Sequence, residues 1–456
     1  MFGFLDAGAR QLSAARKVLT HLAETCDIPV AVRLWDGSTV PLGQGAAETG
    51  LAIALRSPGV IGALLRRPSL DHLLRQYATG GIDFLGGDLI AFGEALRSAK
   101  QKVKLKHLKK SLLLKAAVPF LFARAERKEV QHAYAGDCDG HNTATRNNKD
   151  YIQFHYDLGN DFYKLFLDPE MVYSCGYFTD WNNTLEQAQR DKLEMICRKL
   201  RLSPGEKFLD IGCGWGGLIC HAAQQHGVQA HGVTLSQEQY DYVREKIARL
   251  GLQDRVTVAL CDYRELEGSY DKIASIGMFE HVGIANLPTY FRKLYSLLRD
   301  RGILLNHGIS RRAKPVSKKS RKKRAEYQLV AKYIFPGGEL DDIGHTVNVM
   351  ESSQFEVHDV EGWREHYMQT TAHWCRRLMA NREAAIQEVG PERYRLWTAY
   401  LSIVSFGFKD GSIQIFQVVS SKRASKGRAE LPPTRADLYG PRSNATARKV
   451  ACADQF

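Results

Sequence analysis

The sequence predicts an α/β protein in which a mostly parallel sheet carries helices on both faces, with a smaller α+β domain before it. Three observations support this prediction. Short apolar runs alternate with longer helix-like segments in the second part of the chain, as in parallel strands joined by crossover helices. A glycine-rich turn directly follows the first of these runs. The 456 residues, 44% of them hydrophobic, suffice for two domains with separate cores.

Residues 1–125 form the predicted α+β domain. The run PVAVRLWDG is typical of a short strand, and IGALLRRPSLDHLLRQY has the apolar spacing of helices. Toward its end, KQKVKLKHLKKSLLLK (residues 100–115) places apolar residues at helical spacing among lysines. This pattern is typical either of a solvated helix between domains or of a helix on a membrane surface. Residues 126–150, rich in Gly, Asn and Asp, are predicted to be a linker.

Residues 151–424 form the predicted α/β domain. Its strand-like runs are KFLDIG, HGVTL, VTVALCD, KIASIG and GILLNHG, and LEQAQRDKLEMICRKL and SQEQYDYVREKIARL have helical periodicity. Residues 311–324, RRAKPVSKKSRKKR, are too polar to pack in a core. The same holds for residues 425–456, which we expect to form a flexible basic tail.

Charge and cysteine content restrict the class of protein. The formal net charge is +13, which favours anionic partners such as nucleic acid, an acidic membrane surface or phosphorylated small molecules. Nine cysteines lie scattered without a CxxC pair, so we expect reduced thiols and neither disulfides nor a metal site. The chain starts without a secretory signal pattern, and no apolar run is long enough to span a bilayer. We therefore expect a cytoplasmic protein whose membrane contacts are peripheral.

The segment FLDIGCGWGG predicts a site for a small molecule. Gly212, Gly214, Gly216 and Gly217 follow a strand, where missing side chains let the backbone approach a ligand. The string also satisfies the GxGxxG pattern, so a nicotinamide or flavin dinucleotide has to be considered. Asp210 argues against a dinucleotide, because a carboxylate there would repel a pyrophosphate but could hold a cationic amine. The next strand ends in GVTLSQEQ, without the acid that usually takes the adenosine ribose.

Several segments together resemble a known family. Asp before GxGxG is the pattern of class I S-adenosylmethionine methyltransferases, and FLDIGCGWGG…HGVTLS closely resembles the cyclopropane-fatty-acyl-phospholipid and mycolic acid cyclopropane synthases. The resemblance extends over about residues 151–421 and includes HYDLGNDFY, LDPEMVYSCGYF, TLEQAQ, SIGMFEHVG, KYIFPGG and HYMQTT in the family's order. It implies a class I methyltransferase fold, which is Rossmann-like with a mostly parallel seven-stranded sheet.

The resemblance also implies S-adenosylmethionine as the cofactor. An aromatic–hydroxyl pair would close on its methionine part, polar and aliphatic residues would meet the ribose, and an acid–aromatic pair would meet the adenine. For Gln239 an exposed helix residue remains an alternative, because Gln is a good helix former. The expected cofactor residues are Tyr173, Ser174, Asp210, Gly212, Gly214, Gly216, Thr234, Leu235, Gln239, Asp262 and Tyr263.

In the resembling family a bound bicarbonate ion is the catalytic base. Methyl transfer to an alkene leaves a carbocation, and ring closure then needs a proton to be removed. An ionised carboxylate next to the anion would repel it, whereas a protonated carboxyl group could donate a hydrogen bond to it. We therefore expect Glu280, His307 and bicarbonate to titrate together. An inert buried thiol at Cys175 and an ordinary strand-end histidine at position 307 stay open as alternatives. By motif, the expected catalytic residues are Cys175, Glu280, His307, Ile309 through its amide, and Tyr367.

The stretch HYDLGNDFYKLFLDPEMVYSCGYF gathers many aromatic residues. An aromatic wall can stabilise developing positive charge and keep water out. Tyr173, Tyr177 and Phe178 are candidates for this wall, with ordinary core aromatics as the alternative. One segment departs from the family: YLSIVSFGF has Val404 where a cysteine is common. We expect that thiol to be dispensable, because the anion site is complete without it.

The predicted function is transfer of a methylene group from S-adenosylmethionine to the cis double bond of phospholipid acyl chains, which forms cyclopropane fatty acids. We expect an N-terminal domain that handles or docks on lipid, peripheral association with the inner face of the membrane, unsaturated phospholipids as partners, a homodimer, and no nucleic acid. One alternative is a lipid carbon-methyltransferase that gives a methyl-branched or methylene product. A non-catalytic lipid or nucleic-acid binder is a second alternative, favoured only by the charge.

Overall fold

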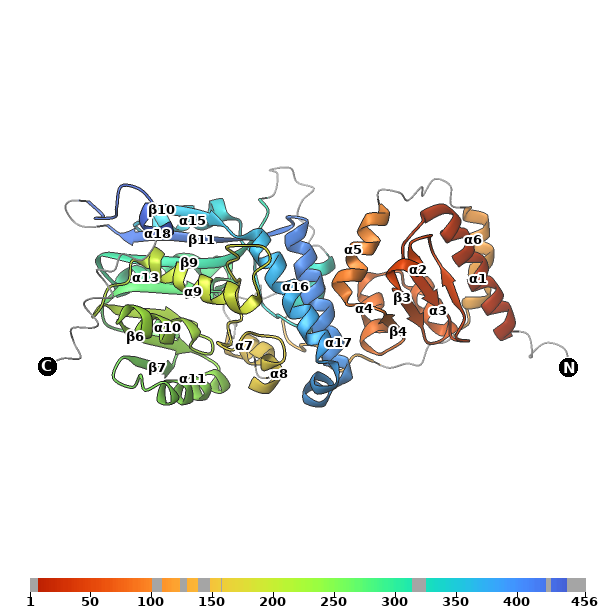
Figure 1. Ribbon diagram of the computed structural model, residues 1–456, viewed down its shortest axis with the longest axis horizontal. Coiled ribbons are helices and arrows are strands. Elements are labelled where there is room, and N and C mark those ends of the chain that lie inside the picture. Colours follow the sequence, from red (N-terminus) through yellow and green to blue (C-terminus); the bar gives the residue numbers. More distant parts are fainter. Residues whose placement is uncertain are drawn as a thin grey trace. The chain divides into compact units, whose positions relative to one another are not determined.

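The computed structural model describes residues 7–100, 109–123, 129–137, 148–156, 158–313, 325–423 and 428–440. The chain divides into two compact units that alternate along the sequence. Their helices and strands are labelled in Figure 1. Unit 1 contains Met1–Ala135, Lys322–Ile334 and Thr371–Phe406, and unit 2 contains Gly136–Arg321, Phe335–Thr370 and Gly407–Phe456.

Unit 1 is built on a four-stranded sheet with the order β2-β1-β3-β4. β1 (Ala31–Arg33) pairs antiparallel with β2 (Thr39–Pro41) and parallel with β3 (Ala52–Leu55), which pairs antiparallel with β4 (Ile82–Leu85). The α+β character predicted for this part is confirmed. Its helices are α1 (Ala7–Cys26), α2 (Ala46–Thr49), α3 (Pro58–Arg66), α4 (Leu70–Ala78), α5 (Leu89–Lys100), α6 (Lys110–Ala117), η2 (Val118–Phe120) and α14 (Ala325–Tyr333).

Residues 371–406 belong to unit 1, although the sequence placed them in one contiguous domain with residues 151–424. They include parts of α16 (Arg364–Ala380) and α17 (Arg382–Lys409). The buried Arg395 guanidinium explains this assignment: it donates to the carbonyls of Tyr77 and Ile82 at 3.1 and 3.0 Å. No described helix, α17 included, is both long and apolar enough to cross a membrane.

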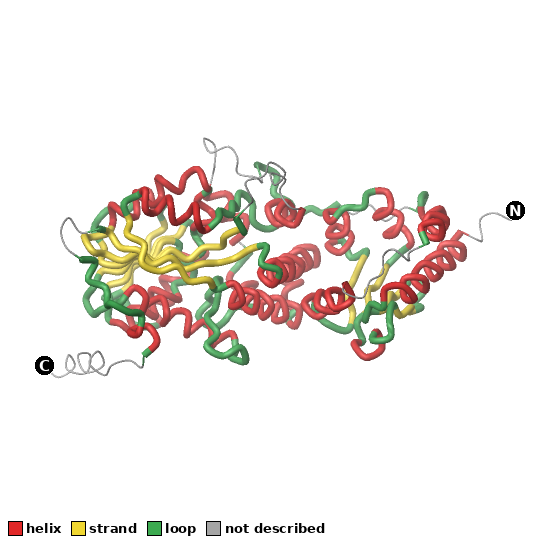
Figure 2. Tube along the Cα trace, turned by 90° about the horizontal axis from the view of Figure 1, so that it is seen from above, coloured by secondary structure: helices red, strands yellow, loops and turns green. Residues whose placement is uncertain are grey.

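Unit 2 contains a seven-stranded sheet with the order β10-β11-β9-β8-β5-β6-β7. β11 (Ile413–Lys422) runs antiparallel to its neighbours β9 (Leu298–Arg311) and β10 (Phe355–Gly362), and the pairs from β9 to β7 are parallel. Figure 2 shows these strands as one twisted layer between helices. The mostly parallel seven-stranded sheet predicted from the sequence is confirmed. The other strands are β5 (Lys207–Ile211), β6 (Gln229–Thr234), β7 (Val256–Leu260) and β8 (Tyr270–Ile276).

Two apolar layers cover the faces of this sheet because successive strand residues point to opposite sides. Phe208 of β5 packs in one layer with Ile196 and Ile219, and the next residue, Leu209, packs in the other with Phe291 and Met350. The first layer contains α9 (Leu185–Leu200), α10 (Gly217–His226) and α11 (Gln237–Arg249), and the second contains α12 (Phe279–Val282), α13 (Leu287–Leu297) and α15 (Ile343–Ser352).

Two segments expected to be irregular contain packed structure. α7 (Asn148–Tyr156) begins inside the expected linker. α18 (Ala436–Tyr439) lies inside the expected flexible tail, where Leu438 is buried. Arg198 of α9 donates to the carbonyls of Leu438 and Gly440 at 3.1 and 2.9 Å, so an apolar anchor and two backbone acceptors hold this part in place. Residues 126–128, 138–147, 425–427 and 441–456 of these segments lie outside the described part.

Candidate active site

One pocket lies at the carboxyl ends of β5, β6 and β8, the edge where open α/β sheets bind ligands. The loops that follow these strands line it, together with the segment 171–174 and the side of α9. Nine of the eleven expected cofactor residues are among the lining residues: Tyr173, Ser174, Asp210, Gly212, Gly214, Thr234, Leu235, Gln239 and Tyr263.

The glycine turn after β5 depends on backbone conformations that favour glycine. Gly212 and Gly214 have φ of 76° and 54°, and the Gly212 amide donates to the Val233 carbonyl at 2.9 Å. Gly216 is not among the described residues that line the pocket. A Cβ there would lie 3.1 Å from the Val243 methyl groups, so this glycine serves the packing of α10 against α11. Its expected role in cofactor binding stays a prediction.

Asp262 is also absent from the described lining residues. Its carboxylate accepts from the Arg264 amide at 2.9 Å and from the Arg264 guanidinium at 2.8 Å. Asp262 thus caps η3 (Tyr263–Glu265) and pairs with a nearby cation, and its expected contact with the adenine stays a prediction. Gln239 is buried and accepts from the Thr234 hydroxyl at 2.7 Å, so the alternative of an exposed helix residue is wrong.

A buried lysine at the pocket was missed in the sequence. Lys192 of α9 lines the pocket and donates to the Ser174 hydroxyl at 3.0 Å. Burial lowers the pKa of Lys192 to about 8 and raises the pKa of Asp210 to about 7, while the attraction between the two charges opposes both shifts. Oδ1 of Asp210 has no hydrogen-bond partner within the described ranges. The sequence feature that could have revealed Lys192 is the position of a lysine on the apolar face of the helical segment LEQAQRDKLEMIC.

Glu280 and His307, both expected to be catalytic, are buried in unit 2. Oε1 of Glu280 accepts from the Ile309 amide at 2.6 Å, and Nδ1 of His307 lies 3.0 Å from the Gln417 amide nitrogen. Burial raises the pKa of Glu280 to about 7. Burial, followed by the charges of Lys192 and Lys199, lowers the pKa of His307 well below its usual value. In the described part of the chain, Oε2 of Glu280 and Nε2 of His307 have no hydrogen-bond partner.

Trp363 connects the other expected catalytic residues to this pair. The Cys175 sulfur lies 3.8 Å from the Trp363 carbonyl, and the His307 ring meets the indole edge-on at 5.2 Å. The Tyr367 amide donates to the same carbonyl at 3.1 Å, while its ring packs against Phe408. Burial raises the pKa of Cys175 well above its usual value, so its thiol is neutral. The five residues therefore lie around Trp363 and β9, separate from the described lining of the cofactor pocket.

The predicted aromatic wall divides between these two places. Tyr173 lines the pocket. Tyr177 instead stacks on Trp363 with ring centroids 4.7 Å apart, and Phe178 stacks on His366 at 6.3 Å. Among the described residues, the remaining aromatic lining of the pocket comes from Tyr156, Trp215, Tyr263 and His281.

The sheet order and the glycine-turn pocket define a class I S-adenosylmethionine-dependent methyltransferase. The structure is similar to that of a mycolic acid cyclopropane synthase, CmaA1, complexed with SAH and CTAB, with a TM-score of 0.58 and 31% identity. That likeness covers 61% of this chain and 100% of the other.

The family model described as mycolic acid cyclopropane synthetase matches residues 143–418. A probable fatty acid methyltransferase from Pseudomonas putida is 35% identical over 421 residues, which are 91% of this chain and 98% of that protein. The cyclopropane-fatty-acyl-phospholipid synthase of Escherichia coli strain K12 is 40% identical over 273 residues, 60% of this chain and 68% of that protein. This chain therefore belongs to the mycolic acid cyclopropane synthetase family of lipid methyltransferases.

Proposed function

We propose that this protein transfers a methylene group from S-adenosylmethionine to the cis double bond of an unsaturated phospholipid acyl chain and so forms a cyclopropane ring. The observation that carries the proposal is the buried pair Glu280 and His307, each with a polar atom unpartnered in the described part of the chain. Loss of a proton from a carbocation needs such a dry acid–base group. The similarity to the E. coli synthase supports the same substrate class.

The lining of the pocket suits S-adenosylmethionine, which supplies an electrophilic methyl group when bound. Gly212 and Gly214 let the backbone lie against the ligand. Gln239 offers an amide for ribose hydroxyls, and Tyr263 offers a ring for the adenine. Oδ1 of Asp210, which has no hydrogen-bond partner among the described residues, can accept a hydrogen bond from a cationic amine.

Glu280, His307 and Ile309 would hold bicarbonate as the base, with Cys175 and Tyr367 beside them. The Ile309 amide donates to Glu280 here, so the anion would have to share or displace that bond. Because the pKa of Glu280 is raised to about 7, its carboxyl group is partly protonated at neutral pH. It can therefore donate a hydrogen bond to the anion instead of repelling it.

The product decides between this proposal and its nearest rival. The protein is incubated with vesicles of cis-unsaturated phospholipid and labelled S-adenosylmethionine, and the acyl chains are analysed by mass and by proton NMR. Upfield ring protons are the expected result. Olefinic or branched-methyl signals would show a lipid carbon-methyltransferase that stops before ring closure. Transfer to no lipid would contradict both.

The bicarbonate requirement has a separate test. Degassed, bicarbonate-free buffer should slow the wild type more than it slows Glu280→Gln or Tyr367→Phe, because these groups serve the anion. Added bicarbonate should restore the wild-type rate. Full activity in degassed buffer, without any response to bicarbonate, would contradict the bound-base mechanism but leave the product assignment standing.

We further propose that unit 1 docks on an anionic membrane surface. Large apolar side chains in α6, in η2 and directly after η2 are exposed, and the exposed Lys109 and Lys115 lie next to or among them in the sequence. Such a cluster marks a contact surface, and each nearby lysine adds about 1 kcal/mol of attraction to an anionic leaflet. Because the proposed substrate is an acyl chain inside a bilayer, lipid is the partner that we propose for this surface. The exposed fractions are 71% for Leu114, 58% for Val118, 46% for Leu121 and 90% for Phe122.

Co-sedimentation with vesicles tests this surface. Binding should be stronger to anionic than to neutral vesicles, fall with added salt, and drop several-fold in Leu114→Ser/Phe122→Ser. Replacement of Arg321, Lys322, Lys323 and Arg324 by Ser tests the second basic segment, which lies outside the described residues. Equal binding to both vesicle types, unchanged in either variant, would contradict the docking role. The homodimer, the cytoplasmic location at the inner membrane face and the lack of a nucleic-acid partner stay predictions.

A further inference from the structure

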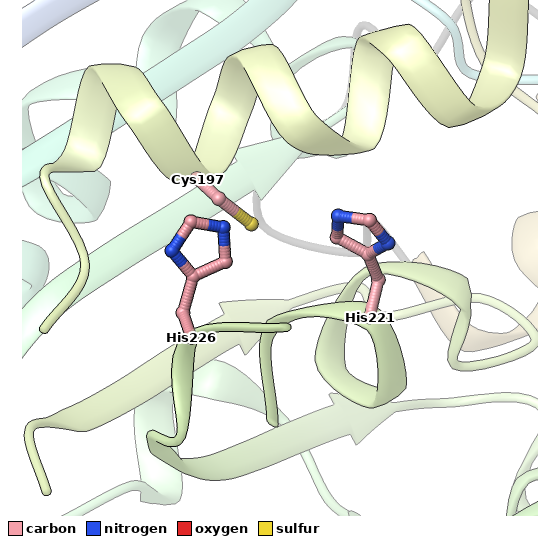
Figure 3. A group of neighbouring side chains, drawn as sticks. All are labelled: Cys197, His221 and His226. Atoms are coloured by element: carbon pink, nitrogen blue, oxygen red, sulfur yellow. The ribbon is translucent and has the colours of Figure 1, made fainter. Parts of the chain in front are cut away.

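Three side chains outside the cofactor pocket form a compact donor group. Cys197 comes from α9, and His221 and His226 come from α10 (Figure 3). One ligand atom from each lies within 4.8 Å of the others. Cys197 is fully buried, and the side chains of His221 and His226 are only 20% and 11% exposed. Figure 3 shows each imidazole presenting a ring nitrogen on the side of the Cys197 sulfur.

A carboxylate completes the group. Oε2 of Glu194, one turn before Cys197 on α9, lies 3.4 Å from Nε2 of His221 and 3.2 Å from Nε2 of His226. Its other oxygen, Oε1, accepts from Nε of Arg198 at 2.8 Å. Arg198 therefore orients Glu194 in the way that outer partners orient metal-binding carboxylates.

We propose that Glu194, Cys197, His221 and His226 bind a zinc ion. Thiolate sulfur, imidazole nitrogen and carboxylate oxygen are the ligands of tetrahedral protein zinc sites. Such a site holds neighbouring ligand atoms about 3.5 Å apart. Cys197 and the two imidazoles, within 4.8 Å of one another, would close by roughly 1 Å, while Glu194 already lies 3.4 and 3.2 Å from the imidazole nitrogens. One thiolate and one carboxylate also balance the charge of a divalent cation. Four protein ligands leave no position for a substrate, so the role is structural.

The ion would brace the two helices that flank the cofactor pocket. α9 carries Lys192, which bonds Ser174, and α10 begins directly after the glycine turn. Of the described residues that line the pocket, none is a proposed zinc ligand, so the ion takes no part in the transfer chemistry. Without metal, both imidazoles could simply bond the Glu194 carboxylate. A zinc ion would take the Cys197 thiolate as a ligand, whereas the bonds between Glu194 and the two imidazoles do not involve it, so replacement of Cys197 distinguishes the two interpretations.

Metal binding is tested on the full chain after treatment with chelator and dialysis. Titration with ZnCl₂ in a calorimeter should give one tight site. Titration with CoCl₂ should give visible tetrahedral bands together with a near-ultraviolet charge-transfer band from thiolate to cobalt. Cys197→Ala should weaken zinc binding by about 100-fold or more and remove the charge-transfer band.

Cys220→Ala is the matched control. Cys220 is buried in the same apolar layer as Cys197, but its charged neighbours are Lys246, Glu170 and Arg249. This variant should keep the zinc affinity and the cobalt spectrum of the wild type. If Cys197→Ala does not fold, His226→Gln, whose side chain is partly exposed, should show the same loss of zinc binding.

Two results would overturn the proposal. One is a wild-type chain that takes up no stoichiometric zinc, which would leave the hydrogen-bonded network alone. The other is zinc or cobalt binding that is equal in the wild type, Cys197→Ala and His226→Gln, which would place the metal elsewhere. Neither result depends on methyl transfer, so the proposed function can stand or fall separately.

Discussion

The cofactor pocket and the group around Glu280 and His307 lie in one unit but are built in opposite ways. The pocket is lined largely by backbone and by loops that each follow a strand, with glycines at positive φ. The second group assembles side chains from α12, β9 and the segment before α9 around Trp363, and burial changes their protonation. The difference suits the two proposed roles, because a cofactor binds at an accessible edge, whereas proton removal from a carbocation is proposed for a dry interior.

Gly212→Val should have the largest effect and should be confined to the pocket. A side chain at φ 76° is strained, and its Cβ would meet Met278 of the pocket lining at 3.4 Å. We expect S-adenosylmethionine binding to fall by about 1,000-fold, or roughly 4 kcal/mol, in calorimetry. Gly205→Val is the control, since it has φ 83° but no neighbour within 4 Å among the described residues. Normal affinity in Gly212→Val would remove the glycine turn from the cofactor site.

Glu280→Gln should have the opposite effect to Gly212→Val: it should slow turnover and leave cofactor binding largely unchanged. The amide can still accept from Ile309 but no longer exchanges a proton, so turnover should fall by about 100-fold or more while cofactor affinity changes less than about twofold. Glu339→Gln is the matched control, because Glu339 also accepts a backbone amide, that of Ile284, at 2.9 Å. Equal loss of turnover in both variants would show that Glu280 has no special part in the reaction.

The buried Glu280 also predicts a pH-dependent stability. Its pKa rises from 4.5 to about 7 on folding, so the unfolded chain ionises first as the pH increases. The wild type should therefore lose stability relative to Glu280→Gln between about pH 4.5 and 7 and keep that deficit above pH 7, at most about 3 kcal/mol. Urea unfolding at pH 5 and pH 8 measures the difference. A gap between the two proteins that does not change with pH would contradict the raised pKa.

Lys192→Met tests the buried charged pair of the pocket, Lys192 and Asp210. Burial shifts the pKa values of this pair as it shifts those of Glu280 and His307. The variant removes the donor to Ser174 and the counter-charge of Asp210, so we expect cofactor affinity to fall by about tenfold. Lys199→Met lies two turns further along α9 and loses contacts to Glu361 and Gln417 instead. It should leave affinity within about twofold of the wild type. Equal effects in both variants would indicate a general loss of α9 packing.

Sequence patterns predicted the structural features that depend on residues close together in the sequence. The strands of unit 2, the turn at Gly212 and Gly214, and the placement of Gln239 follow from short stretches whose conformation is set locally. Patterns do not reveal a role that a tertiary neighbour adds. Gly216 lets α10 pack on Val243, and Asp262 pairs with Arg264.

Residues that come together only in the fold were harder to predict. Lys192 belongs to a helix whose partners lie far along the chain. The absence of a CxxC pair argued against a metal site, whereas the proposed zinc ligands in Figure 3 come from two helices, and Cys197 precedes His221 by 24 residues. Spacing rules recognise ligands that are close in sequence and cannot find ligands that only packing assembles.

The alternation of the two units along the chain limits the order in which the protein can be completed during synthesis. Unit 1 needs Arg395 against Tyr77 and Asp83, and Phe406 packs so tightly on Gly93 that a Cβ there would overlap the ring. The ribosome has made most of unit 2 before it releases these residues. A nascent chain cut off at residue 135 holds the whole apolar core around Val30 and Phe92 but lacks the later partners of Tyr77, Asp83 and Gly93. Unit 1 is therefore not complete as one contiguous fragment. Expression of residues 1–135 alone should yield an incompletely folded product, which fragment complementation with 371–406 could repair.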